Sequence, residues 1–262
     1  MTSIEGAGLD ARFEFGRVVG QTFSLIGRNF VLFVILALVF VGAPQFGLLY
    51  AQMNAIGAGD TGQMALIGFA ALFVNAVMSF VLQGALTRAA VDDLSGSGVK
   101  AGAAIADGLR FFFPLLLVAI LVGLGLMLGF LLLIVPGIIL AVRWSMTAPI
   151  VVIEQAGPTK SMERSAELSS GHRWAIFGLF LLYLVFAYAL QLLLGIFLSM
   201  FSAGDPAQVI AMDGFGLGYG VASAAVSALI ALVSTVGVAS LYFELRRVKE
   251  GVGVAELANV FA

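Results

Sequence analysis

The chain has 262 residues, of which 61% are hydrophobic and only 11% are charged, and its formal net charge at pH 7 is −2. Soluble domains carry about 25% charged residues, so this composition excludes a water-soluble globular domain and indicates a protein for which lipid is most of the solvent. The chain has no cysteine, which excludes disulfides and thiol chemistry.

The first 28 residues do not have the layout of a cleaved signal peptide. Acidic side chains are interspersed with arginines there, and the first apolar run begins only at Phe30. A signal peptide instead has a basic start, a short apolar stretch and a small-residue cleavage site. We therefore expect the first apolar run to remain in the mature protein as a membrane anchor.

Long apolar runs along the rest of the chain predict membrane-spanning helices. Each run is longer than the ~20 residues that an α-helix needs to cross a hydrocarbon core about 30 Å thick. The period-2 alternation of membrane β-strands is absent, so the predicted fold class is an all-α integral membrane protein. The runs without any charged residue are 29–59, 61–87, 111–142, 174–204 and 214–243.

The positions of lysine and arginine decide how often these runs cross the membrane. Short loops that carry Lys and Arg lie in the cytoplasm, and the loops 53–63 and 201–213 carry neither residue. If 111–142 crossed only once, the basic stretch 154–174 would lie outside, against this rule.

A reversal of the chain at Pro136 and Gly137 returns every Lys- and Arg-rich segment to the cytoplasm. Pro136 lacks the N–H that a continuing helix would use, and Gly137 tolerates the geometry of a turn. We therefore predict six spans with both termini in the cytoplasm, and a single kinked helix over 111–142 is the alternative. A tag after Ala262 that is accessible outside intact cells would exclude the six-span topology.

Three stretches share a layout in which a weakly amphipathic segment ends in an arginine and an aromatic residue then opens an outward span. The arginines are Arg28, Arg110 and Arg173. The pattern predicts three units, each a cytoplasmic interfacial helix followed by a helical hairpin, in one transmembrane domain over 1–262. Convergence is the alternative, because any span entered from the cytoplasm tends to start this way. The predicted spans lie near 30–52, 64–87, 112–134, 137–153, 175–200 and 215–243, and the interfacial helices near 14–28, 99–110 and 158–170.

Small residues recur every four positions in the last span, at Gly216, Gly220, Ala224 and Ala228. This spacing lets two helix backbones approach closely. The stripe predicts helix packing, either within the chain or in an oligomer.

Arg143 is the polar residue that most needs an explanation. It lies about 10 Å past Pro136 along a helix that rises 1.5 Å per residue, and Glu154 follows three turns later on the same face. A charge at membrane depth usually faces the bundle interior and marks a functional site. Arg143 would then bind an anionic headgroup or a carboxylate such as Glu154; alternatively, it snorkels to the headgroups from a shallow hairpin.

Other polar residues within the spans have a structural and a functional interpretation. Asn75 and Gln83 lie close to one face of the second span, and Gln191 lies in the fifth. Interhelical hydrogen bonds explain such residues in membrane helices, and a transport path is the alternative.

The stretch 154–174 is the densest polar region of the chain. Lys160, Arg164 and Arg173 suit contact with anionic lipid, each contributing on the order of 1 kcal/mol near such a surface. A solvated connector helix is the alternative. The single histidine, His172, has no second His or Cys with which to bind a metal.

The sequence contains no catalytic constellation, so we expect a protein that is not an enzyme and needs no cofactor. There is no nucleophile elbow and no phosphate-binding G-x-x-x-x-G-K-[ST] loop. The glycine-rich stretch 214–220 opens a membrane span and does not follow a strand. Nucleic-acid binding is excluded because the chain lacks the basic surface that it requires.

Motifs between residues 131 and 174 support a resemblance. An apolar span ends in an I-P-G-like turn, and a short span with an arginine and a proline follows, then a glutamate, then a basic helix with R-S-x-x-L and G-x-x-W. These elements stand here as Ile134-Val135-Pro136-Gly137, Arg143, Pro149, Glu154, Arg164-Ser165 with Leu168, and Gly171 with Trp174.

This region resembles the YciC-like bacterial inner-membrane proteins and the related membrane domain attached to some glycerophosphoryl diester phosphodiesterases. The inserted Val135 and the acidic Glu163 and Glu167 depart from the pattern. The resemblance implies a six-span protein of the bacterial inner membrane without enzyme activity, since phosphodiesterase activity resides in a separate soluble barrel. It also places Ser165 beside Arg164 among the candidate site residues.

These observations predict a non-enzymatic protein that binds or organises lipid or a partner membrane protein. The partners would be anionic lipid headgroups, another membrane protein or a second copy of the chain. A small transporter or channel using Arg143 is the alternative, and a lipid enzyme would lack a base and a nucleophile. The candidate binding residues are Arg143, Glu154, Lys160, Arg164, Ser165 and Arg173.

Overall fold

The computed structural model describes residues 13–58, 61–94, 98–200 and 215–251. These residues form helices joined by short turns, without a strand among them, which confirms the predicted all-α class. The chain is a multi-pass membrane protein, because six of its helical stretches are long and apolar enough to cross a bilayer. These stretches are Phe30–Gln52, Thr61–Leu94, Phe112–Leu132, Ile134–Ile153, Arg173–Phe197 and Gly218–Glu250.

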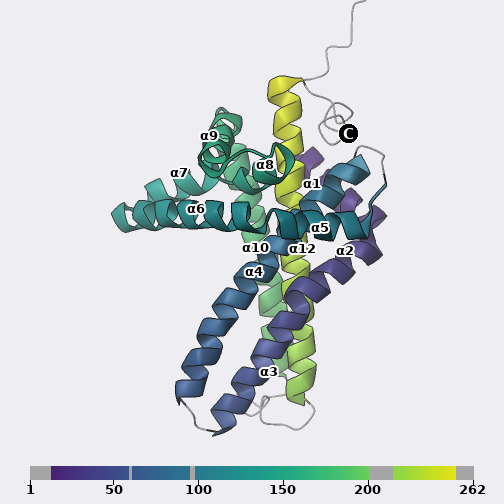
Figure 1. Ribbon diagram of the computed structural model, residues 1–262, viewed down its shortest axis with the longest axis vertical. Coiled ribbons are helices and arrows are strands. Elements are labelled where there is room, and N and C mark those ends of the chain that lie inside the picture. Colours follow the sequence, from purple (N-terminus) through teal and green to yellow (C-terminus); the bar gives the residue numbers. More distant parts are fainter. Residues whose placement is uncertain (1–12, 59–60, 95–97, 201–214, 252–262) are drawn as a thin grey trace, which may run out of the picture.

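Several long helices run along the long axis of the molecule (Figure 1). Helix α12 is central and contacts most of the other elements, whereas α10 has an apolar stretch of 18 residues in which none is buried. The long-axis helices are α3 (Ala43–Ala58), α4 (Thr61–Leu94), α10 (Arg173–Ser199) and α12 (Phe215–Glu250).

Helix α2 (Phe30–Ala37) continues into α3 through a π-helical turn, η1 (Leu38–Gly42). The small residues of α12 pack on this continuous helix. A Cβ at Gly42 would lie 3.5 Å from the Ala224 carbonyl oxygen, and a Cβ at Gly220 would lie 2.9 Å from Phe46 Cε2. The predicted small-residue stripe therefore serves packing within the chain.

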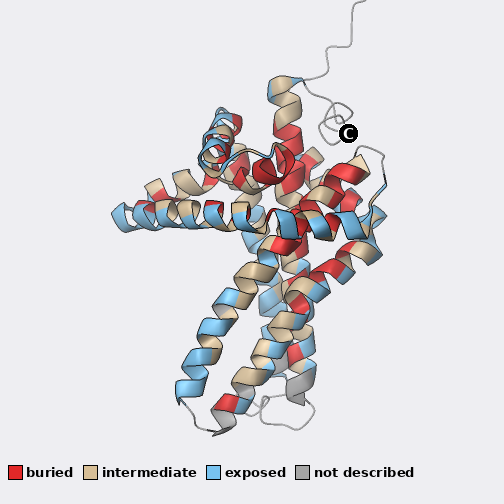
Figure 2. Ribbon diagram, in the orientation of Figure 1, coloured by how far each residue is buried: buried red, intermediate tan, exposed pale blue. Residues whose placement is uncertain are grey.

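The buried core lies at one end of the molecule, where short helices meet the C-terminal halves of α4 and α12 (Figure 2). Three of these helices coincide with the amphipathic segments that the sequence predicts. Helices α4 and α5 are in close contact there, since a Cβ at Gly108 would lie 2.5 Å from the Val81 carbonyl oxygen. The short helices are α1 (Phe15–Arg28), α5 (Ala101–Arg110), α8 (Thr147–Ile153) and α9 (Pro158–Ser169).

The reversal near Pro136 is present, but it occurs three residues earlier than predicted. Helix α6 (Phe112–Leu132) is followed by Leu133, whose backbone is extended, and α7 (Ile134–Arg143) begins at the next residue. Pro136 lies in the first turn of α7, where its missing N–H costs no intrahelical hydrogen bond. Gly137 lies where the two helices touch, because a Cβ there would be 2.4 Å from Phe130 Cδ1. Its absent side chain is used for close packing, and the prediction of turn geometry at Gly137 is wrong.

The predicted span 137–153 is divided into two short helices. Helix α7 ends at Arg143, and α8 starts at Thr147 after a turn. Helix α8 is almost completely buried and packs on α9, α4 and α6. Helix α6 lies across the long-axis helices, with α7 beside it (Figure 1).

Candidate functional site

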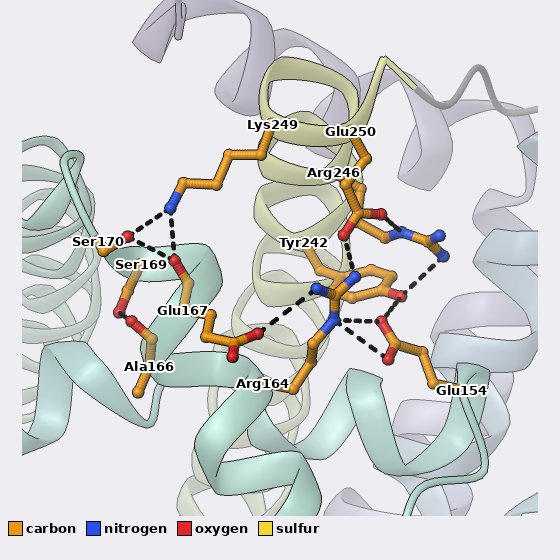
Figure 3. Close-up of polar contacts among 10 residues, drawn as sticks. All are labelled: Glu154, Arg164, Ala166, Glu167, Ser169, Ser170, Tyr242, Arg246, Lys249 and Glu250. Carbon is orange, nitrogen blue, oxygen red and sulfur yellow. Dashed lines mark hydrogen bonds and ion pairs between the residues drawn. The ribbon is translucent and has the colours of Figure 1, made fainter.

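A network of charged and phenolic side chains joins α8, α9 and α12 at the buried end of the molecule (Figure 3). The Tyr242 hydroxyl donates to Glu154 Oε1 at 2.8 Å and accepts from Arg246 Nη1 at 3.2 Å. Arg164 forms an ion pair with Glu154 at 3.3 Å and another with Glu250. The acids and bases of this network neutralise one another, so it fastens three helices together.

A second ionic cluster fastens α1 to α12. The side chain of Glu244 is only 1% exposed, and its carboxylate lies 2.8 Å from Arg247 Nη2 and 3.6 Å from Arg17 Nε. The backbone N–H of Glu14 also donates to Glu244 Oε1 at 3.3 Å. These partners offset the cost of burying the carboxylate.

Ser165 holds the turn between α7 and α8. Its hydroxyl donates to the Arg143 carbonyl oxygen at 2.8 Å and accepts from the Met146 N–H at 3.1 Å. Ser165 is therefore a cap for two helix ends, and its hydroxyl is fully buried there.

Arg143 and Glu154, which the sequence suggested as partners, do not pair. Glu154 accepts from Tyr242 and Arg164, while the Arg143 side chain is exposed at the end of α7. Within the described residues Arg143 has no ion pair. Its exposed position agrees with the snorkelling interpretation.

Several cations of the described part of the chain are exposed and have neither a carboxylate nor a hydrogen-bond partner there. Glu163 is the corresponding exposed acid within the same residues. Positive charge therefore exceeds negative charge among the side chains that are free to bind. Trp174, which is 85% exposed, directly follows Arg173 in the sequence. The cations are Lys100, Arg110, Arg143, Lys160 and Arg173.

Gln83 of the second predicted span and Gln191 of the fifth line one cleft between α4, α10 and α12. The cleft has a volume of about 340 Å³, and Gln83 lines it from α4 while Gln191 lines it from α10. Neither glutamine hydrogen-bonds to another described residue. Asn75 does not line the cleft and donates to the Ala71 carbonyl oxygen at 2.8 Å. The other polar lining residues are Ser79, Tyr183, Ser227, Ser234 and Thr235.

A second, apolar cavity of about 300 Å³ lies between α1, α10 and α12. Tyr183 and Ser234 line both hollows. Arg143 lines neither of them, and the described residues that line the two cavities include no charged side chain. Within the described residues, no three His, Asp or Glu side chains lie together as metal ligands would.

Sequence reasoning identified Glu154 and Arg164 but missed their partners on α12. Tyr242, Arg246 and Glu250 follow one another at four-residue intervals, which places them on one helix face. That periodicity was available in the sequence, but it does not reveal which segment the face meets.

Comparison with known proteins adds no assignment, because no family model, curated protein or solved structure matches the chain.

Proposed function

We propose that this chain is a non-enzymatic protein of the bacterial inner membrane that binds anionic lipid headgroups at its cytoplasmic end. The binding side chains are Arg143, Lys160 and Arg173. The observation that carries the proposal is that these exposed cations have no carboxylate partner among the described residues. Glu154, Arg164 and Ser165, by contrast, are engaged in holding helices together.

The proposed topology follows the basic residues of the sequence. Both termini lie in the cytoplasm, and α1, α5 and α9 lie at the inner surface. Arg173 and Trp174 together suit this position, because an arginine binds phosphate while an indole ring prefers the headgroup region. The resemblance of residues 131–174 to the YciC-like proteins supports the same location and remains a prediction.

Titration of the purified protein with a short-chain phosphatidylglycerol, followed by native mass spectrometry, tests the proposal. Each cation contributes about 1 kcal/mol near an anionic surface, so the triple variant R143Q/K160Q/R173Q should bind this lipid one to two orders of magnitude more weakly. Binding of a matched phosphatidylethanolamine should change little.

The double variant K100Q/R110Q is the control, because these cations are also exposed but lie on α5 or at its end. It should keep most of the affinity for phosphatidylglycerol. Equal binding of the two lipids by the unmodified chain, or equal losses in both variants, would contradict the assignment of the site.

Binding or passage of a small neutral polar solute is a second candidate function. Gln83 and Gln191 face the cleft without hydrogen-bond partners among the described residues. An unpaired amide away from water is costly, so these side chains favour a cleft that contains water or a polar ligand.

A further inference from the structure

The return arm of the α6–α7 hairpin is too short to cross a bilayer. Helix α7 has 10 residues and rises about 15 Å, which is half of a hydrocarbon core about 30 Å thick. The turn at residues 144–146 then redirects the chain into α8, which is buried in the protein. If α6 crossed to the far side, α7 would bring Arg143 back only to the bilayer centre, where a charge is expensive.

The position along α4 at which the hairpin begins also argues against a crossing of the bilayer by α6. Helix α6 meets α4 at Phe80, whose ring centroid lies 6.4 Å from that of Phe112. Below Phe80, α4 continues for about 29 Å to Thr61, which is already the thickness of a hydrocarbon core. Helix α12 similarly extends for about 33 Å between Gly237, which approaches Thr22 of α1, and Phe215.

From that level α6 runs across the long-axis helices and not along them (Figure 1). Most of the bilayer thickness that α4 and α12 cross therefore lies to one side of the hairpin, and the hairpin is level with the remaining leaflet. The opposite side of the hairpin carries α9, which packs on both α6 and α7.

The tip of the hairpin has no feature of a water-exposed loop. Five consecutive apolar residues from Leu131 to Val135 are 64% to 78% exposed (Figure 2). The Leu133 N–H donates to the Gly129 carbonyl oxygen at 3.1 Å, and the Leu133 carbonyl oxygen accepts from the Gly137 N–H at 3.4 Å. An apolar turn in which both backbone groups of Leu133 are hydrogen-bonded is compatible with hydrocarbon, whereas its exposed apolar side chains are unfavourable in water.

We propose that the α6–α7 hairpin lies in the plane of the membrane, inserted among the acyl chains of the leaflet beside α1, α5 and α9. A helix is about 10 Å across and a leaflet of hydrocarbon is about 15 Å thick, so the hairpin fits within one leaflet. Arg143 then reaches the headgroups from the end of α7. Calling this leaflet cytoplasmic depends on the proposed topology, whereas the in-plane orientation does not.

The in-plane hairpin leaves every Lys- and Arg-rich segment on the same side of the membrane. This distribution of charge was the reason for predicting a reversal near residue 136. A segment that crosses twice and a segment that does not cross both return the chain to the same side. The positive-inside rule is therefore satisfied by spans at α2–α3, α4, α10 and α12 alone.

A depth profile along α6 distinguishes the two orientations. The chain has no native cysteine, so single cysteines at Ile120, Leu124, Leu128 and Leu132 can carry nitroxide labels in the full-length protein in vesicles. All four positions are exposed, at 49%, 51%, 56% and 75%. Oxygen and nickel-chelate accessibilities then report the depth of each label.

An in-plane hairpin predicts depths that vary only with rotation about the helix axis and stay within a helix diameter of about 10 Å. A crossing helix predicts a progression of about 6 Å at each four-residue step, and this result would overturn the proposal. The depth profile does not involve anionic lipid. Its outcome therefore tests the orientation of the hairpin independently of the proposed headgroup site.

Maleimide labelling provides the second measurement. In intact cells an impermeant maleimide should label Thr61→Cys, at the start of α4, and leave Leu132→Cys at the background of the cysteine-free parent. In inverted vesicles it should label Lys160→Cys but again not Leu132→Cys until detergent is added. Labelling of Leu132→Cys from either aqueous side would exclude a tip embedded in lipid.

Discussion

At the scale of single residues, charged side chains either hold the fold together or remain available for binding. Arg164 belongs to the first group, since it pairs with Glu154 and Glu250 across three helices. Burial disfavours the charge of Arg164, but the carboxylates of Glu154 and Glu250 outweigh this effect and raise the pKa of the guanidinium above its usual value. Arg143 belongs to the second group.

The two arginines therefore predict opposite effects of the same substitution. Arg164→Gln removes the cation from two partly buried carboxylates and should lower the free energy of unfolding by about 1.5–3 kcal/mol. Arg143→Gln removes no ion pair among the described residues and should change it by less than about 0.5 kcal/mol. Unfolding of the detergent-solubilised proteins, followed by circular dichroism, measures both. Equal losses would show that Arg143 has a structural role.

The charged residues of the candidate site are easier to identify from the sequence than the residues with which they pair. Glu154, Arg164 and Arg143 are conspicuous because charges are rare in an apolar chain. The contact between Glu154 and Tyr242 joins residues 88 positions apart, and no local pattern specifies it. The proposed pairing of Arg143 with Glu154 failed because helical periodicity does not continue through the turn at 144–146.

At the scale of helices, the Pro-Gly pair shows how the same signal has two meanings. Pro136 correctly indicated that the apolar run is interrupted, because proline disrupts a helix interior. Proline is equally compatible with the first turn of a new helix, whose N–H groups have no intrahelical acceptors. The break therefore lies at Leu133, a residue with no turn propensity of its own.

The contact between α4 and α5 gives a prediction at this scale. Gly108→Ala places a methyl group 2.5 Å from the Val81 carbonyl oxygen, so the two helices must separate. We expect a loss of about 1–3 kcal/mol in the free energy of unfolding.

Gly102→Ala is the control on the same helix, because a Cβ there meets nothing within 4 Å. Alanine is the better helix former, so this variant should be neutral or up to about 1 kcal/mol more stable. A parallel response of the two variants in thermal unfolding would mean that α5 does not pack on α4 as described.

At the scale of the whole molecule, the helices are packed tightly at one end and diverge toward the other. The buried core joins α1, α5 and α8 to the C-terminal halves of α4 and α12, while the polar cleft lies where α4, α10 and α12 separate. Apolar run lengths predict the long helices, because only a membrane explains such runs. They do not predict orientation, so an in-plane helix and a spanning helix look alike in the sequence.

The divergence of the helices predicts water within the membrane-spanning part. A cysteine at Ser227, which lines the cleft, should react with a small hydrophilic methanethiosulfonate reagent, since a thiolate forms only where water enters. A cysteine at Leu229, on the same helix but outside the cleft lining, should react much more slowly. Similar rates at both positions would show that the cleft is not hydrated and would remove the support for solute binding.

The central position of α12 has a consequence for the order of events during synthesis. Helix α12 contacts α1, α2, α3, α4, α8, α9 and α10, yet it leaves the ribosome after all of them. Until then Glu154 and Arg164 lack Tyr242 and Glu250, and the glycine face of η1 has nothing to pack against. The contacts that these helices make with α12 can therefore form only after the last described helix has been synthesised.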